Sequence, residues 1–251
     1  MSWTVAIALS ALLVAVIVLL SRPMKIPREP DREGIEDAEA VRAYNRVSRW
    51  PIFTIERHIM LSALAKYKPQ GILVDIGCGP GYLAAQISRR FPGLRVVGVD
   101  ISNEMLSTAK RNWSSRSYPN VEFVMGDAQR LPFPDSTVDF IVSSFSLHHL
   151  ANAEIAVREI HRVLKPDGQF LILDVRRDGP RFFYYTLRLG QALAAPAAIR
   201  RNNGAVGSFW ASYTPAELRG IFATVPWQKA QIQNGVGWIL ASGSKASTCK
   251  S

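Results

Sequence analysis

The chain opens with a long apolar run. Residues 2–21 contain no charged side chain, and Leu, Val, Ile and Ala fill most positions of 3–20. Because about 20 apolar residues in a helix cross the hydrocarbon core of a bilayer, the run predicts a transmembrane helix over residues 1–21. A cleaved signal peptide and a buried core helix are the alternatives. No Lys or Arg precedes the run, and Leu19–Pro23 is a poor cleavage site, so we favour an uncleaved anchor.

The residues after this run predict its orientation. Arg22, Lys25 and Arg28 follow it, with no acidic residue before Glu29. Since basic residues concentrate on the cytoplasmic side of membrane helices, we expect the rest of the chain to lie in the cytoplasm, held by a single-pass anchor. Residues 22–34 are rich in proline and charge and indicate a linker, which leaves 35–251 as the folded domain.

Short apolar runs then alternate with amphipathic stretches. Most of the runs are continuously apolar, as in parallel strands that are covered on both faces. Two stretches between them, 103–113 and 152–164, carry apolar residues at helical spacing. We expect Asn152 to cap the second helix and Lys165–Gly168 to end it. The runs that predict strands are 71–76, 94–99, 121–125, 138–143 and 169–173.

The end of the chain has a different pattern. Thr214 and Pro215 predict a helix start. Two further strands, 227–233 and 236–242, flank Asn234–Gly235, which is a strong hairpin signal. We therefore expect an α/β fold, a doubly wound and mostly parallel sheet of seven strands with a reversed last strand, preceded by one transmembrane helix. Ligands of such sheets bind at the carboxyl ends of the strands.

Charge is unevenly distributed along the 251 residues, whose formal net charge is +10. Residues 1–34 carry +1, residues 35–175 carry +1 and residues 176–251 carry +8. A strongly basic protein often binds nucleic acid or an anionic membrane. Because the middle of the chain is nearly neutral, the charge favours contact with a membrane surface and makes nucleic acid a poor candidate partner.

Candidate chemistry begins where the first strand ends. The loop Gly77–Gly81 has glycine at every second position, and glycines at a strand-to-helix turn let the backbone approach a ligand closely. Asp75 precedes the loop, and Asp100 ends the second strand, where a carboxylate can accept hydrogen bonds from ribose hydroxyls. Asp127 follows the third strand, where it can accept from an adenine amino group. The alternative is that each Asp caps a helix or a turn.

Six stretches in this order resemble the class I S-adenosylmethionine-dependent methyltransferases, and among them the type 11 group, whose substrates are small molecules such as quinones. The resemblance covers about residues 40–175 and implies a Rossmann-like methyltransferase fold with S-adenosyl-L-methionine as cofactor. The matching stretches are 74–81, 97–102, 126–128, 139–145, 147–150 and 159–169.

The resemblance also implies which residues bind the cofactor. Its methionine end would be held by the glycine loop and by side chains at the ends of strands one and four, its ribose by Asp100, and its adenine by residues after strands two and three. Tyr44, in the segment before the core, would close the pocket, although packing on the sheet is an equal alternative. The expected cofactor-binding residues are Tyr44, Asp75, Gly77, Gly79, Gly81, Asp100, Ile101, Met105, Asp127, Ala128, Ser144 and Phe145.

Two histidines are candidates for the catalytic step. His148 and His149 follow the fourth strand, where one of them can act as a general base if the methyl acceptor must lose a proton. The alternative is that one packs against or caps the next helix. The histidines form no metal-ligand pattern, so no metal site is expected. Neither Cys78 nor Cys249 is placed to act as a nucleophile, and two cysteines make no disulfide framework.

Residues 175–213 are predicted to form a lid over the substrate, as the resemblance implies. Within them, the segment 176–201 interleaves arginines with aromatic and apolar residues, a composition typical of helices at membrane surfaces. A helix packed on the sheet is the alternative. We expect a methyltransferase that acts on a small, lipophilic acceptor at the cytoplasmic face of a membrane. A nucleic-acid or protein methyltransferase and a non-catalytic cofactor-binding membrane module are the alternatives.

Overall fold

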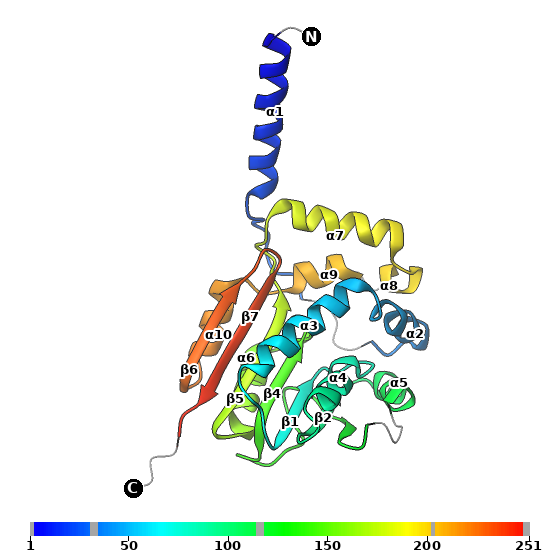
Figure 1. Cartoon of the computed structure of the whole chain (residues 1–251), viewed down its shortest axis with the longest axis vertical. Helices are drawn as coiled ribbons and strands as arrows, with labels where there is room; N and C mark the ends of the chain where they lie inside the picture. The colour runs from blue at the N-terminus through cyan, green and yellow to red at the C-terminus, as the bar shows by residue number, and fades with distance from the viewer. Residues whose placement is uncertain (1–2, 31–34, 114–117, 202–203, 248–251) are drawn as a thin grey trace.

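The computed structural model describes residues 3–30, 35–113, 118–201 and 204–247. Helices and strands alternate through the middle of the chain, and the four helices α7 to α10 separate the fifth strand from the last two strands (Figure 1). The helices are α1 Trp3–Ser21, α2 Ala38–Val47, α3 Pro51–Ala65, α4 Tyr82–Arg90, α5 Asn103–Trp113, η1 Leu147–His149, α6 Ala153–Val163, α7 Arg181–Ala194, α8 Ala197–Arg201, α9 Gly204–Ala211 and α10 Pro215–Ala223. The strands are β1 Ile72–Ile76, β2 Arg95–Asp100, β3 Val121–Met125, β4 Val138–Ser144, β5 Leu164–Val175, β6 Trp227–Asn234 and β7 Trp238–Lys245.

One sheet of seven strands holds the domain together, in the order β3-β2-β1-β4-β5-β7-β6. Strands β1 to β5 run parallel, and β7 is antiparallel to both of its neighbours, β5 and β6. The predicted mostly parallel sheet with a reversed last strand is therefore confirmed. β1 lies at the centre of the parallel part, where Asp75 is the register partner of Gly98 on β2 and of Val142 on β4.

Both faces of the sheet are covered, which explains why the strand runs are continuously apolar. On one face, Val74 and Ile141 pack in a cluster with residues of α6 and α10. On the other face, Leu73 and Phe140 pack in a second cluster with residues of α3, α4 and α5. Consecutive strand residues point to opposite faces, so each apolar neighbour along a strand belongs to a different core.

The helix boundaries agree with the sequence signals. α5 coincides with the predicted stretch, and α6 begins after Asn152, whose side chain accepts hydrogen bonds from the first-turn amides of Glu154 and Ile155. Before α10, Thr214 and Glu217 form a reciprocal capping box, with Pro215 at the first helical position. Caps of this kind stabilise a helix by about 1 kcal/mol, so the ends are fixed by local chemistry as well as by packing.

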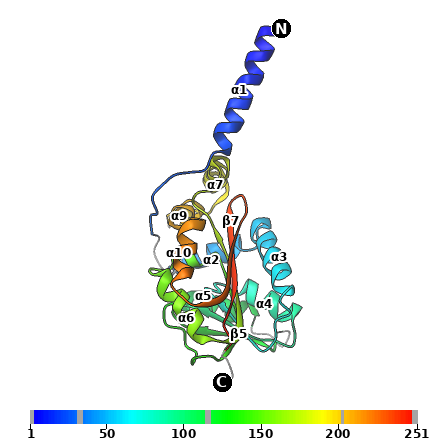
Figure 2. The ribbon, with the colours of Figure 1, turned by 90° about the vertical axis from the view of Figure 1, so that its left-hand side faces the viewer.

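Among the residues that the structure describes, no helix is long and apolar enough to cross a membrane. The transmembrane helix predicted over residues 1–21 is therefore not confirmed. α1 projects away from the sheet (Figure 2), and its Leu13 and Ile17 side chains are exposed.

The segment after α1, predicted as a linker, is attached to the domain through specific contacts. Arg28 donates hydrogen bonds to the carbonyl oxygens of Ala211 and His148 and lies over the ring of Tyr213. The amide of Glu29 donates to the carbonyl oxygen of Trp210. The described part of this segment therefore runs along α9 and the loop after β4.

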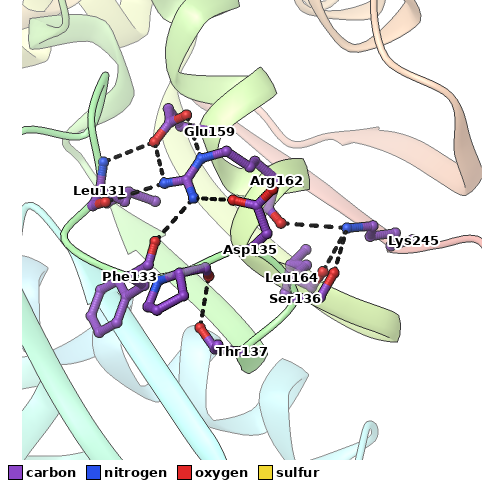
Figure 3. A network of polar contacts seen from close by, with 10 residues as sticks. Leu131, Phe133, Asp135, Ser136, Thr137, Glu159, Arg162, Leu164 and Lys245 are labelled. Carbon is purple, nitrogen blue, oxygen red and sulfur yellow. Dashed lines mark hydrogen bonds and ion pairs between the residues drawn. The ribbon is translucent and has the colours of Figure 1, made fainter.

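Arg162 is the residue through which the motif over residues 159–169 contributes to the fold. Its guanidinium donates to the carboxylates of Glu159 and Asp135 and to the carbonyl oxygens of Leu131 and Phe133 (Figure 3). These bonds join the end of α6 to the connection between β3 and β4. The motif therefore fixes the sheet architecture and lies apart from the glycine loop.

Replacing Arg162 with Met should destabilise the protein by about 2 kcal/mol, because four oxygen acceptors lose their charged donor. The hydrogen bond from Arg162 holds the pKa of Glu159 below its usual range. A lowered carboxyl pKa adds stability above the unfolded-state value near 4.3, and this stability is lost as the pH falls through the folded-state value. Urea unfolding at pH 7 and pH 3 should show a smaller pH effect in Arg162→Met. Arg158→Met, an exposed neighbour on the same helix, should change stability by less than about 0.5 kcal/mol. An equal loss in both variants would contradict this role.

Candidate active site

The loop between β1 and α4 requires its glycines. Gly77, Gly79 and Gly81 all have positive φ angles, of 69°, 51° and 81°. A Cβ atom on Gly77 would lie 1.9 Å from Oγ of Ser146, and one on Gly81 would lie 2.7 Å from the ring of Phe123. Side chains rarely adopt this backbone region and these two would also clash, so the loop adopts its close turn only with glycine.

Asp100 connects this loop to the end of β2. Its carboxylate accepts hydrogen bonds from the amides of Gly79, at 2.7 Å, and Ser102, at 2.9 Å. Burial raises the pKa of Asp100, and the amide donors oppose that shift. The carboxylate predicted to bind a ribose is therefore held at the mouth of the glycine loop.

Asp75 is a buried carboxyl group with an unused acceptor. Its side chain is 1% exposed, and its Oδ2 atom has no hydrogen-bond partner within the described residues. Burial raises the pKa of Asp75 well above its usual range, and the nearby acids Glu56 and Asp100 raise it further. A buried acceptor without a partner is costly, so this position favours a ligand that brings a hydrogen-bond donor or a positive charge.

Glu56 lies against the same loop and was not predicted from the sequence. It comes from α3, is 7% exposed, and accepts a short hydrogen bond from the Ser144 hydroxyl at the end of β4. Burial raises the pKa of Glu56 to about 7, although Ser144 and Arg57 lower it. The sequence signal is the spacing Glu56, Met60 and Leu64, which places a charged residue on the buried face of a helix.

One small cavity is lined by Glu56, Asp75 and two of the loop glycines, and Asp100 lies outside its lining. Its volume is about 60 Å³, well below the ~300–1,000 Å³ typical of pockets for drug-sized ligands. Admission of a nucleoside-sized ligand therefore requires the side chains of α2 and α3 to move away from the loop. Of the predicted residues, the cavity is lined by Tyr44, Asp75, Gly77, Gly79, Ser144 and Phe145; its other lining residues are Ser48, Phe53, Glu56, Arg57, Cys78, Pro80, Tyr82 and Leu83.

Three aromatic rings in contact with one another line part of the cavity. Phe53 packs edge-on against both Tyr44 and Phe145, with ring centroids 6.1 Å and 6.2 Å apart. Burial and the negative charge of Glu56 raise the pKa of Tyr44 to about 12, so its phenol is neutral at physiological pH. Tyr44 thus lies beside the loop, on a helix that precedes the sheet, and its role in closing the cofactor pocket stays a prediction.

Six predicted cofactor residues do not line this cavity: Gly81, Asp100, Ile101, Met105, Asp127 and Ala128. Ile101 is 37% exposed, whereas Met105 and Ala128 are buried. The Asp127 carboxylate accepts a hydrogen bond from the Gln129 amide at 2.8 Å, which is a turn contact. Ile101 and Met105 follow β2, and Asp127 and Ala128 follow β3, which is the neighbour of β2 in the sheet. An adenine-binding role for these four residues remains a prediction.

The two predicted histidines pack against one another outside the cavity lining, with ring centroids 4.0 Å apart and the rings tilted by 44°. His148 is 2% exposed, and its Nδ1 atom lies 2.6 Å from Oδ1 of Asp174 at the end of β5. A proton on Nδ1 would bond to Asp174 and leave Nε2, which is buried without a partner in the described structure, as an acceptor. Burial lowers the pKa of His149 well below its usual range, which keeps that ring neutral.

Asp174 is the second site residue that the sequence analysis missed. It is 2% exposed and also accepts a hydrogen bond from the His148 backbone amide at 2.9 Å. The available signal was an acidic residue directly after the apolar run of the fifth strand, the same signal that identified Asp100.

The comparisons with known proteins agree with this site. The family described as "Methyltransferase domain" matches residues 74–172, which contain the loop, Asp100 and both histidines. The ubiquinone/menaquinone biosynthesis C-methyltransferase UbiE of Pseudomonas putida is 38% identical over 127 residues, which are 50% of this chain and 47% of that protein. The chain spans about half the length of the curated relatives it matches. Residues 74–172 thus match the methyltransferase domain family.

Solved structures share the fold over most of the chain. A proposed S-adenosyl-L-methionine-dependent methyltransferase of Methanococcus maripaludis has a TM-score of 0.66 at 18% identity, covering 89% of this chain and 100% of that one. Phosphoethanolamine N-methyltransferase 2 of Haemonchus contortus, solved in complex with S-adenosyl-L-methionine, has a TM-score of 0.61 at 16% identity, covering 84% and 57%. At these identities the likeness shows the fold, which is the predicted Rossmann-like methyltransferase fold.

Glu56 provides a test of the site electrostatics. A carboxyl pKa raised to about 7 gives stability that is fully present below the unfolded value near 4.3 and is lost as the pH rises through 7. The wild type should therefore lose on the order of 2 kcal/mol of unfolding free energy between pH 5 and pH 8, and Glu56→Gln should lose much less. Urea unfolding across this range measures the difference. Glu36→Gln, at an exposed position, is the control and should behave as the wild type does. Identical pH profiles for Glu56→Gln and the wild type would refute the assignment.

Proposed function

We propose that this chain is an S-adenosyl-L-methionine-dependent methyltransferase. The observation that carries the proposal is the unpartnered, buried Oδ2 atom of Asp75 beside a glycine loop, inside a segment that matches a methyltransferase domain. S-adenosyl-L-methionine carries an ammonium group and a sulfonium cation, so it suits a cavity whose ionisable groups are mainly acidic. No basic side chain lines the cavity except Arg57.

The residues present fit this cofactor. Asp75 and Glu56 would accept hydrogen bonds from its ammonium group, and the glycine loop would pass beside its amino-acid end. Asp100 would accept from the ribose hydroxyls, as it now accepts from two amides. The rings of Tyr44 and Phe145 would lie near the sulfonium, which an aromatic face attracts.

When bound, the cofactor supplies an electrophilic methyl group. The protein contributes alignment and the exclusion of water, because transfer is an in-line displacement. Aromatic rings from α2, α3 and the loop after β4 line the cavity and would exclude water from it. For acceptors that must lose a proton, we propose His148 as the base, oriented by Asp174, with His149 packed against it as a neutral support.

We propose that the methyl acceptor is small and lipophilic. The relative named above is a quinone-biosynthesis C-methyltransferase by name, and quinones are lipophilic. Helices α7 to α9, within the predicted lid over 175–213, lie above the strand ends (Figure 1), and α9 packs against η1 with its histidines. Aromatic and apolar side chains on these helices, such as Phe183 and Tyr184, suit a lipophilic substrate.

Nucleic acid is a weaker candidate partner, because several basic side chains of the last third already have acidic partners. Arg176 pairs with Asp178, Arg177 with Glu217, and Arg201 with Glu39. Paired arginines contribute less to phosphate binding than free ones. A non-catalytic cofactor-binding module would bind the cofactor without transferring its methyl group. The next experiment measures that transfer.

Cofactor binding should depend on Asp75 and Asp100. Calorimetry with S-adenosyl-L-methionine should show binding to the wild type and a loss of at least about tenfold in Asp75→Asn and in Asp100→Asn, because each removes a charge-assisted hydrogen bond. Asp167→Asn is the control, since Asp167 is exposed and its positive φ of 63° suits Asn. Incubation of extracted lipids with methyl-labelled cofactor should give a labelled product. Full affinity in both site variants, or binding without any labelled product, would contradict the proposed enzyme.

We also propose that the chain works at a membrane, attached through its N-terminal helix, with the methyltransferase domain in the cytoplasm. The uncharged run over 2–21 and the basic flank after it support this location. In cells that express the full chain, it should remain with the membrane fraction after a carbonate wash. Protease added to the outside of intact cells should leave the domain uncut. Release by carbonate, or cleavage from outside, would contradict this location.

A further inference from the structure

A second cavity, of about 660 Å³, lies where α1 ends and α7 begins, away from the glycine loop. Three of its lining residues are basic and none is acidic. The lining residues are Arg22, Pro23, Met24, Lys25, Ile26, Arg181 and Tyr185. A cavity with this lining favours an anion, and its size admits a group as large as a phosphorylated headgroup.

The two sides of the cavity are joined through the backbone. The amide of Met24 donates to the carbonyl oxygen of Gly179 at 2.9 Å, and the amide of Arg181 donates to the carbonyl oxygen of Arg22 at 3.0 Å. An isolated bridge pairs Pro23 with Pro180 between them. These bonds bring Arg22 and Arg181 to the same opening, although two like charges repel each other there.

The three basic side chains have no acidic partner in the described structure. No carboxylate among the described residues forms an ion pair with Arg22, Lys25 or Arg181. In contrast, Arg176 and Arg177, only a few residues before Arg181, are both paired with acids. Arg22, Lys25 and Arg181 thus bring three basic side chains without an acidic partner in the described structure to one cavity.

Apolar side chains flank the cavity on both helices. On α7, Phe182, Tyr185, Leu189 and Leu193 are 41%, 50%, 60% and 77% exposed, and their spacing places them along one side of the helix. On α1, a run of apolar side chains that includes Leu19 is also exposed. Figure 1 shows α7 lying across the base of α1, and the basic cavity is lined by the end of α1 and the start of α7.

Exposed apolar side chains on both sides of the site would contribute nothing to the binding of a free phosphate ion. The phosphate of a lipid headgroup, in contrast, is always attached to apolar chains that such side chains can contact. We propose that Arg22, Lys25 and Arg181 bind the phosphate of an anionic phospholipid, and that α7 lies along the lipid surface with its exposed apolar side buried in it. Interfacial helices combine these features, an apolar face with basic residues at its border. This binding would hold the lid helices α7 to α9 at the surface from which a lipophilic acceptor enters. It goes beyond the methyltransferase activity and does not depend on it.

Vesicle partitioning of the full chain tests the headgroup site. Vesicles of phosphatidylcholine alone and of phosphatidylcholine mixed with phosphatidylglycerol would be compared, with the protein delivered from detergent. The triple variant Arg22→Gln, Lys25→Gln, Arg181→Gln should bind the mixed vesicles at least about tenfold more weakly, since each basic group near an anionic surface contributes roughly fivefold. Its binding to neutral vesicles should stay the same.

A control variant with the same loss of charge identifies the site. Arg111→Gln, Arg219→Gln and Lys229→Gln remove three exposed basic side chains elsewhere, and this variant should keep most of the preference for anionic vesicles. An equal loss in both triple variants would overturn the site in favour of general charge attraction. Inorganic phosphate that abolishes the preference at low millimolar concentration would overturn the lipid as occupant in favour of a free anion.

The apolar side of α7 is tested separately. Leu189→Ser with Leu193→Ser should weaken binding to both kinds of vesicle, because both lose apolar contact. Unchanged binding would overturn the placement of α7 on the lipid. Calorimetry with S-adenosyl-L-methionine should give the wild-type affinity in every variant. This measurement shows that the variants are folded, and it separates failure of the lipid site from failure of the proposed methyltransferase activity.

Discussion

Two buried carboxyl groups line one small cavity and a third, half-buried, is bonded to its glycine loop; this arrangement constrains the rest of the site. Glu56, Asp75 and Asp100 come from α3, β1 and β2, and burial raises the pKa of each. Negative charges in a poorly hydrated site repel one another strongly unless a cation lies between them or the carboxylates take up protons. The sheet, with its two packed faces, holds these groups in place despite that cost.

The same constraint connects the fold to the proposed chemistry. A ligand that brings positive charge relieves the repulsion, and S-adenosyl-L-methionine brings two cationic centres. The glycine loop and the Asp100 hydrogen bond to Gly79 fix where the ligand can approach. Aromatic side chains of α2 and α3 line the same cavity. Part of the free energy of cofactor binding can therefore position the methyl group and exclude water.

The parts of this site that are local in the sequence were predictable, and the parts that depend on tertiary contacts were not. The glycine loop and Asp100 follow buried strands, so their positions at one edge of a parallel sheet could be inferred from the pattern alone. Glu56 lies on a helix outside the matching family segment, and only packing brings it to Ser144. The adenine-binding role of Asp127 remains a prediction, and the transmembrane helix over residues 1–21 was not confirmed.

Proton release on cofactor binding tests the central claim most directly. Calorimetry of S-adenosyl-L-methionine binding near pH 7, repeated in buffers with different ionisation enthalpies, gives the number of protons exchanged. If the cofactor's cations settle beside Glu56 and Asp75, binding lowers the pKa of both carboxyl groups and releases protons, and Glu56→Gln reduces the release. Binding with no proton release, or with proton uptake, would contradict a cavity whose buried carboxyl groups are neutralised by the cofactor.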